Sequence, residues 1–174
     1  MIAQVKGSFK IFEGSIYTTD KTFTTAVIDL WIDASSITTG DKKRDEHLIG
    51  ADFFDTQKHA QISFTSSTIG AADSKGKHEL WGELTMKGIT KTIKLEVVFG
   101  GIMKDPWGNE KAGFEVSGKI NRSDWGLIWN TALEAGGLMV SEEVSISAEI
   151  ELLNLGKKEL TMELEDKNKR TVTM

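Results

Sequence analysis

The chain has 174 residues, of which 39% are hydrophobic and 27% charged, and it contains no cysteine. This length predicts one domain that buries enough surface to fold without disulfides, and the lack of cysteine excludes thiolate catalysis and Cys-ligated zinc. A net charge of −5 argues against binding a nucleic-acid backbone by charge. No apolar run reaches the roughly 18 residues of a transmembrane helix, so we expect no stable membrane insertion.

Apolar and polar residues alternate with period two along most of the chain, which is typical of strands with one apolar face. The pattern predicts strands over 4–13, 22–33, 60–69, 77–86, 90–102, 110–121 and 142–153. Asp105 to Asn109, with Pro106 and Gly108, is typical of a tight turn. Many alternating strands joined by turns predict an all-β fold, an antiparallel barrel or sandwich.

Two segments depart from this alternation. Residues 41–55 predict a short helix, with Asp41 as the N-cap and Leu48, Phe53 and Phe54 as its buried residues. Residues 123–141 form a long connection that carries Trp125 and Trp129, and a loop of this length often covers a site.

Catalytic motifs are weak. Residues 113–119 (GFEVSGK) contain most of a phosphate-binding P-loop, but Ile120 stands where Ser or Thr is needed and the segment alternates as a strand. His47, His59 and His78 share no metal-ligand spacing, and there is no G-x-S-x-G elbow. We therefore expect no enzyme, no catalytic residue and no metal.

Two arginines lie beside carboxylates, Arg44 next to Asp45 and Arg122 near Asp124. The simpler interpretation is an ion-pair network that holds the helix and the long connection to the barrel. The alternative is that Arg44 or Arg122 faces the head group of a ligand, because a guanidinium suits phosphate and carbonyl oxygens.

Several ordered motifs together carry a resemblance. They are Val5–Phe9 with Phe12–Gly14, Ser36–Gly40, Arg44–Leu48 with Asp52–Asp55, Ile62–Phe64, Gly82–Lys91 and Asn121–Leu127. On these motifs, residues 1–153 resemble the bacterial YceI-like family of lipocalin-like, polyisoprenoid-binding barrels. The resemblance implies an antiparallel barrel with a short helix and a long loop at its mouth, and an apolar tunnel that binds or transports an isoprenoid lipid or quinone. It implies no catalytic residues and no cofactor beyond that ligand.

A tunnel of this kind would be lined by the apolar rows of the strands, with two tryptophans near the mouth. The candidate ligand-binding residues are Ile28, Leu30, Phe64, Leu84, Leu95, Val97, Phe114, Val116, Ile146 and Ala148, with Trp125 and Trp129 at the mouth. Each buried methylene contributes about 0.8 kcal/mol, so an apolar chain alone could bind tightly. The alternative, which periodicity does not separate from the first, is a packed core without ligand.

The two ends of the chain depart from the family pattern. The family's first strand, ahead of Gly7, is missing, which leaves an unpaired sheet edge. Residues 154–174 alternate at Leu160, Met162 and Leu164, and we expect a hairpin from this tail, or a partner chain such as a second copy in a homodimer, to cover that edge. An equal alternative is a frayed terminus.

Two other functions stay open at this stage. One is an interaction module that recruits a partner strand to the open edge, and the less favoured one is an enzyme acting on a hydrophobic substrate inside the barrel. Residues 1–12 lack a signal-peptide pattern, so the chain as given predicts a cytoplasmic location, or a periplasmic one if its true start lies upstream.

Overall fold

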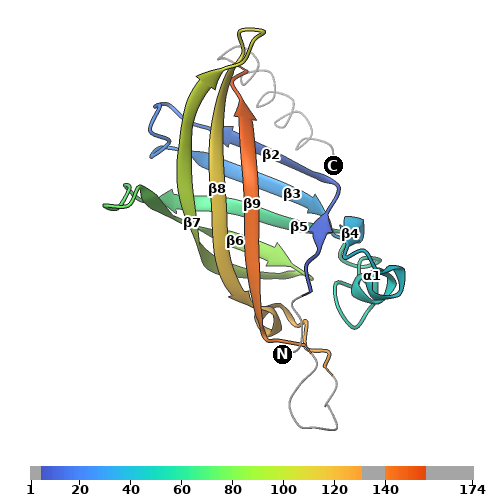
Figure 1. The fold of residues 1–174 in the computed structure, drawn as a ribbon. Helices are drawn as coiled ribbons and strands as arrows, with labels where there is room; N and C mark the ends of the chain where they lie inside the picture. Colours follow the sequence, from blue (N-terminus) through green and yellow to red (C-terminus); the bar gives the residue numbers. More distant parts are fainter. Residues whose placement is uncertain (1–4, 131–139, 156–174) are drawn as a thin grey trace, which may run out of the picture.

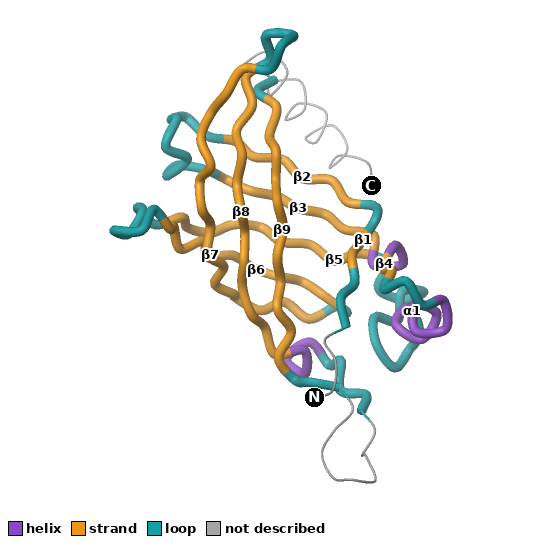
Figure 2. Tube along the Cα trace, in the orientation of Figure 1, coloured by secondary structure: helices purple, strands orange, loops and turns teal. Residues whose placement is uncertain are grey.

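A curled antiparallel sheet dominates the computed structural model, which describes residues 5–130 and 140–155 (Figure 1). The seven strands of the sheet lie in the order β2-β3-β5-β6-β7-β8-β9. Their bounds are Phe12–Tyr17, Val27–Asp33, Gln61–Ile69, Lys77–Met86, Ile89–Lys104, Glu110–Asn121 and Glu143–Leu153. Figure 2 shows β7, β8 and β9 running across β2, β3 and β5, so that the sheet forms a half-barrel.

The strand register places the apolar rows on one face of the sheet. Residues directly opposite each other in an antiparallel pair have side chains on the same face. Leu30 pairs with Phe64 and Phe64 with Leu84, while Val97 pairs with Val116 and Val116 with Ala148. Because these rows face the inside of the curl, the alternation in the sequence becomes a single apolar inner face.

The outer face of the same strands carries charged residues that pair across the sheet. Lys77 Nζ lies 2.7 Å from Glu96 Oε2, and Lys94 Nζ lies 2.8 Å from Glu79 Oε1. These pairs are partly exposed, so each stabilises the fold weakly. Because these charged side chains are costly to bury, the outer face stays in contact with solvent and the apolar face is the one that is buried.

The first predicted strand, 4–13, is wrong in its extent because the chain changes partner inside it. β1, Ser8–Phe9, pairs with β4, Ile37–Thr38, in a separate two-stranded sheet, whereas β2 joins the large sheet. At the break, the amides of Lys10 and Ile11 both donate to Ser36 Oγ at 3.1 Å. The strand predicted over 22–33 begins only at Val27, because residues 18–26 form the loop between β2 and β3.

The sheet has two free edges in the described part of the chain. β2 and β9 each pair with one neighbour there, and β1 pairs with β4 and not with β9. The predicted barrel is therefore a half-barrel by strand pairing. The predicted tail hairpin, residues 154–174, lies almost wholly outside the described residues, which end at Leu155.

The predicted helix is confirmed, though it is shorter than 41–55. α1 spans Lys42–Ile49, and the Asp41 side chain caps it by accepting a hydrogen bond from the Arg44 amide at 3.1 Å. Asp45 ties the helix to β4 by accepting from Thr38 Oγ1 and from the Thr39 amide and hydroxyl. Leu48, Phe53 and Phe54 pack against the core as predicted. Among the described residues no helix is long and apolar enough to span a membrane.

Candidate functional site

Ten of the twelve predicted ligand-binding residues gather in one apolar cluster on the inner face. Buried members are Phe64, Leu84, Leu95, Val97 and Trp125, and partly buried members are Ile28, Leu30, Phe114, Val116 and Trp129. Ile146 and Ala148 follow the same face on β9, at the free edge of the sheet, where Ala148 is exposed. The register thus brings the predicted row together, and its contact with a ligand stays a prediction.

Aromatic side chains gather at one end of this row. Two 3-10 turns flank the sheet, η1 (Ala34–Ser36) and η2 (Arg122–Trp125), and η2 inserts Trp125 into the interior. Trp125 is 1% exposed, and its Nε1 donates to the Leu84 main-chain oxygen at 3.0 Å. Trp129 packs edge-on against His47, with ring centroids 4.7 Å apart. This end is therefore closed by rings that come from the helix and from the long connection.

A second aromatic group closes the opposite end. Phe99 on β7 and Phe114 on β8 lie opposite each other, with ring centroids 5.2 Å apart. Phe23, from the loop between β2 and β3, packs against both, at 5.4 Å from Phe99 and 4.9 Å from Phe114. The apolar row thus runs between two aromatic ends.

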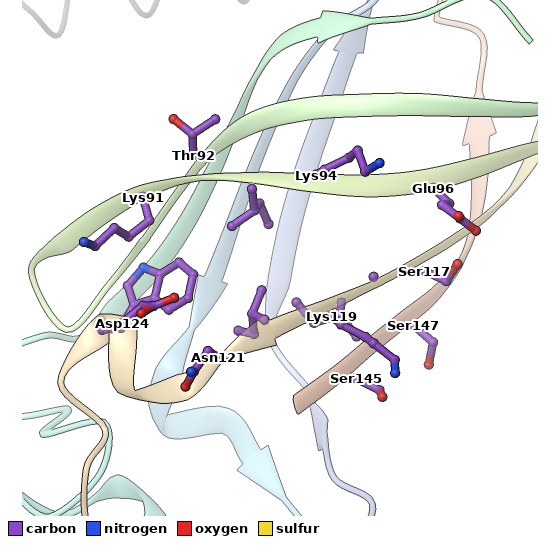
Figure 3. Close-up of a pocket in the computed structure, with 15 residues that line it drawn as sticks. Lys91, Thr92, Lys94, Glu96, Ser117, Lys119, Asn121, Asp124, Ser145 and Ser147 are labelled. Atoms are coloured by element: carbon purple, nitrogen blue, oxygen red, sulfur yellow. The ribbon is translucent and has the colours of Figure 1, made fainter. Parts of the chain in front are cut away.

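A pocket of about 900 Å³ opens between β7 and β8. The register between these strands ends at the pair Leu95 and Gly118, and Figure 3 shows the two ribbons diverging beyond that point. Apolar side chains of the inner face line its depth, namely Ile93, Ile120, Trp125 and Ile146. Its rim is polar and is formed by Lys91, Thr92, Lys94, Glu96, Ser117, Lys119, Asn121, Asp124, Ser145 and Ser147.

Ion pairs order the rim of this pocket. The hydrogen bond from Lys94 to Glu79 raises the pKa of Lys94 and lowers that of Glu79. Lys119 Nζ lies 2.8 Å from Glu143 Oε1. The rim therefore offers cationic, anionic and hydroxyl groups around an apolar floor, and this combination suits an amphipathic molecule.

Arg122, one of the two head-group candidates, is 4% exposed and makes a set of internal hydrogen bonds. Its Nε donates to the Ser141 oxygen at 2.9 Å, its Nη1 to the oxygens of Leu127 and Trp129, and its Nη2 pairs with Glu142 at 3.2 Å. All three nitrogens serve the long connection, which favours the structural interpretation. Its ionic partner is Glu142, where the sequence suggested Asp124.

Arg44, the other candidate, is exposed on α1 and also bonds within the chain. Its Nε donates to Thr39 Oγ1 at 2.7 Å and its Nη2 to the Thr39 oxygen at 3.2 Å. The adjacent Asp45 has a lowered pKa, chiefly because the Thr39 hydroxyl donates to it and less because Arg44 lies near. The predicted anchoring of the helix is thus achieved mainly through threonine hydroxyls.

Sequence reasoning missed the lysines of the rim and the role of Phe23. Lys94 and Lys119 alternate with apolar residues as ordinary outer-face charges do, and Lys91 lies at the start of the inner row, opposite Leu84. The sequence does not reveal the pocket, because the point at which two strands diverge depends on their pairing and not on either strand alone. Phe23 lay within a predicted strand. The nearby Asp20 and Thr22 can form turns with their side chains, and these residues could have indicated a loop before Val27.

The predicted strand over the P-loop-like segment is confirmed, since residues 113–119 lie within β8. His78 Nδ1 lies 2.8 Å from the Gly70 oxygen, so that histidine joins β5 to β6. In the residues that the structure describes, no group of three His, Asp or Glu side chains could hold a metal ion.

A curled, one-sided antiparallel sheet with an apolar inner face defines a lipocalin-like architecture, and comparison with known proteins specifies it further. The sequence profile of the YceI-like domain matches residues 1–152. The UPF0312 protein SAS2572 of Staphylococcus aureus is 37% identical over 152 residues, which cover 87% of this chain and 85% of that protein. The chain therefore belongs to the YceI-like family.

Solved structures agree with this assignment. The YceI protein of Campylobacter jejuni superposes with a TM-score of 0.78 at 30% identity, covering 91% of this chain and 88% of that one. A polyisoprenoid binding domain from Saccharophagus degradans superposes with a TM-score of 0.55 at 17% identity, covering 83% of each chain. The second match shows the shared fold.

Proposed function

We propose that this protein binds an amphipathic isoprenoid lipid or quinone without transforming it. The observation that carries the proposal is the pocket between β7 and β8, whose apolar floor belongs to the inner row of the sheet and whose rim is polar. Such a site separates an apolar chain from a polar head group. The family assignment and the polyisoprenoid-binding domain that shares the fold support the same ligand class.

The apolar chain would follow the inner row of β7 and β8. From Ile93 to Phe99 on β7, and from Ile120 to Phe114 on β8, the path from the pocket to the opposite aromatic end is six residue steps long. At about 3.4 Å per residue this path is roughly 20 Å long. Because each buried methylene contributes about 0.8 kcal/mol, a chain along this path would supply most of the binding free energy, and the polar rim would orient the head group.

The test is native mass spectrometry of gently purified protein, followed by organic extraction and identification of the released molecules. The wild type is compared with Val116→Lys, which places a charge on the inner row, and with Glu115→Lys, which places the same side chain on the outer face of the same strand. Circular dichroism establishes that each variant is folded.

The proposal requires an isoprenoid or quinone, near one per chain, in the wild type and in Glu115→Lys, and its loss in folded Val116→Lys. Ligand retained by Val116→Lys would remove the inner row from the site. Wild-type protein that carries no lipid and takes up none on incubation would refute the proposal.

The free edge of β9 favours a second candidate, an interaction module that recruits a partner strand. β9 is 11 residues long and pairs only with β8 within the described ranges, and Val144 on its inner face is 39% exposed. Cross-linking that traps one specific partner on β9, in protein that carries no lipid, would favour this function over lipid binding.

A further inference from the structure

Phe23 occupies an unexpected place in the fold. It belongs to the loop between β2 and β3, and two further strands, β5 and β6, separate β3 from β7 in the sheet order. Even so, its ring packs against Phe99 on β7 and Phe114 on β8. In Figures 1 and 2, β2 and β3 run behind β7, β8 and β9, and the loop that joins them lies beside β7.

The backbone holds this ring in place at an energetic cost. Phe23 has φ of 59°, in the left-handed region that a bulky residue rarely adopts. The Asp20 carboxylate fixes the loop around it, accepting from the Thr22 amide and hydroxyl at 2.8 and 2.5 Å and from the Thr25 hydroxyl at 2.6 Å. The Thr22 hydroxyl, and after it the Thr25 hydroxyl, also lower the pKa of Asp20 strongly by donating to its carboxylate.

Phe23 also stands at the end of the apolar path. The inner row of β7 runs from Ile93 at the pocket through Leu95 and Val97 to Phe99, and Phe23 covers Phe99. A chain that enters between β7 and β8 would meet this ring after roughly 20 Å. At this end of the row, Phe23 is the ring that a loop distant in sequence places against β7 and β8.

We propose that Phe23 is a specificity-determining residue that stops the apolar path and thereby sets the greatest chain length that the protein binds. This inference rests on the proposed function, since it assigns a length limit to the same ligand class. It makes the loop between β2 and β3, whose residues 22–26 the sequence predicted as part of a strand, a part of the binding site.

The test uses a homologous series of all-trans polyprenols, from farnesol to undecaprenol, with affinity measured by competition against a fluorescent apolar probe. The primary variant is Phe23→Gly, because glycine adopts φ of 59° freely and this change removes the ring without straining the loop. Phe23→Leu, which keeps an apolar side chain at the stop, is the second variant. Thr24→Ala, at an exposed neighbour in the same loop, is the matched control.

In the wild type and in Thr24→Ala, affinity should rise about tenfold or more with each added isoprene unit, because each unit buries several more carbons at about 0.8 kcal/mol per methylene. The rise should stop at the length at which the chain reaches Phe23. In Phe23→Gly the rise should continue by at least one further unit, and in Phe23→Leu the limit should lie at or between these two. Every variant should bind the shortest polyprenols with wild-type affinity, because these do not reach the stop.

An identical length limit in Phe23→Gly and the wild type would overturn the role of Phe23 while leaving lipid binding intact. Absence of binding to every polyprenol by the wild type would overturn the proposed function and this inference together. Should Phe23→Gly fail to fold, Phe23→Asn replaces it, because asparagine tolerates this left-handed backbone conformation and removes the ring. An unchanged length limit in folded Phe23→Asn would then overturn the inference.

Discussion

The ring of Phe64 on β5 lies directly against Gly82 on β6, in the space that a side chain at position 82 would fill. A Cβ at this position would also lie 2.6 Å from the Thr65 main-chain oxygen. Gly82 belongs to the inner row, between Leu80 and Leu84, so the absence of a side chain there lets a large ring from the next strand cover the sheet. The inner face is therefore matched in shape across strands as well as apolar.

This contact predicts that Gly82→Ala destabilises the fold severely, by about 3 kcal/mol, since both obstacles are rigid. Gly118→Ala is the matched comparison on the same face. There the added Cβ would meet the end of the Leu95 side chain, which can rotate away, so we expect a loss near 1 kcal/mol. Urea unfolding of the two variants checks this, and equal losses would contradict the shape argument.

Arg122→Met should destabilise the protein by about 3 kcal/mol, because it leaves the oxygens of Ser141, Leu127 and Trp129 without their donor. Arg122→Lys should recover only part of the loss, since an ammonium cannot reproduce the fork. Arg44→Met, at an exposed position, is the control and should change the free energy of unfolding little. The measurement is urea denaturation. An unchanged free energy of unfolding in Arg122→Met would mean that the long connection does not depend on this side chain.

The contribution of Asp45 to stability should depend on pH in a defined direction. Its pKa in the folded protein lies below the ordinary value of 3.8, first because the Thr39 hydroxyl donates to the carboxylate. The contribution is therefore complete above that value and is lost as pH falls through the lowered pKa. The difference in unfolding free energy between wild type and Asp45→Asn should shrink as the solution is acidified. A difference that grows on acidification would refute the assignment.

Trp125→Phe should keep much of the buried area but leave the Leu84 oxygen without its indole donor, at a cost of about 2 kcal/mol. Trp129→Phe, at a less buried ring, should cost less. The emission spectrum offers a second measurement, since Trp125 is 1% exposed and its loss should remove the bluest component. A red-shifted loss would place Trp125 in water and contradict the structure.

The alternating pattern predicted most of the sheet correctly. The five strands from β5 to β9 fall within a few residues of their predicted bounds, and the N-cap at Asp41 and the turn at Asp105 to Asn109 are confirmed. These features are local, because strand faces, caps and turns depend on residues within a few positions of each other. The prediction failed at residues 10–11, where the distant Ser36 binds both amides. It also failed at 22–26, where Asp20 holds the loop through Thr22 and Thr25 and Phe23 packs against the distant Phe99 and Phe114.

The amino-acid sequence by itself determined the fold class, the apolar row and the family, because each follows from local alternation or from ordered motifs. The tertiary structure alone decided that the pairing of β7 with β8 ends at Leu95 and Gly118. It also decided that Arg122 bonds to the main chain of the long connection and that Phe23 packs against β7 and β8. These relationships join residues that are distant along the chain. They depend on strand register and on the curl of the sheet, which no short stretch of sequence encodes.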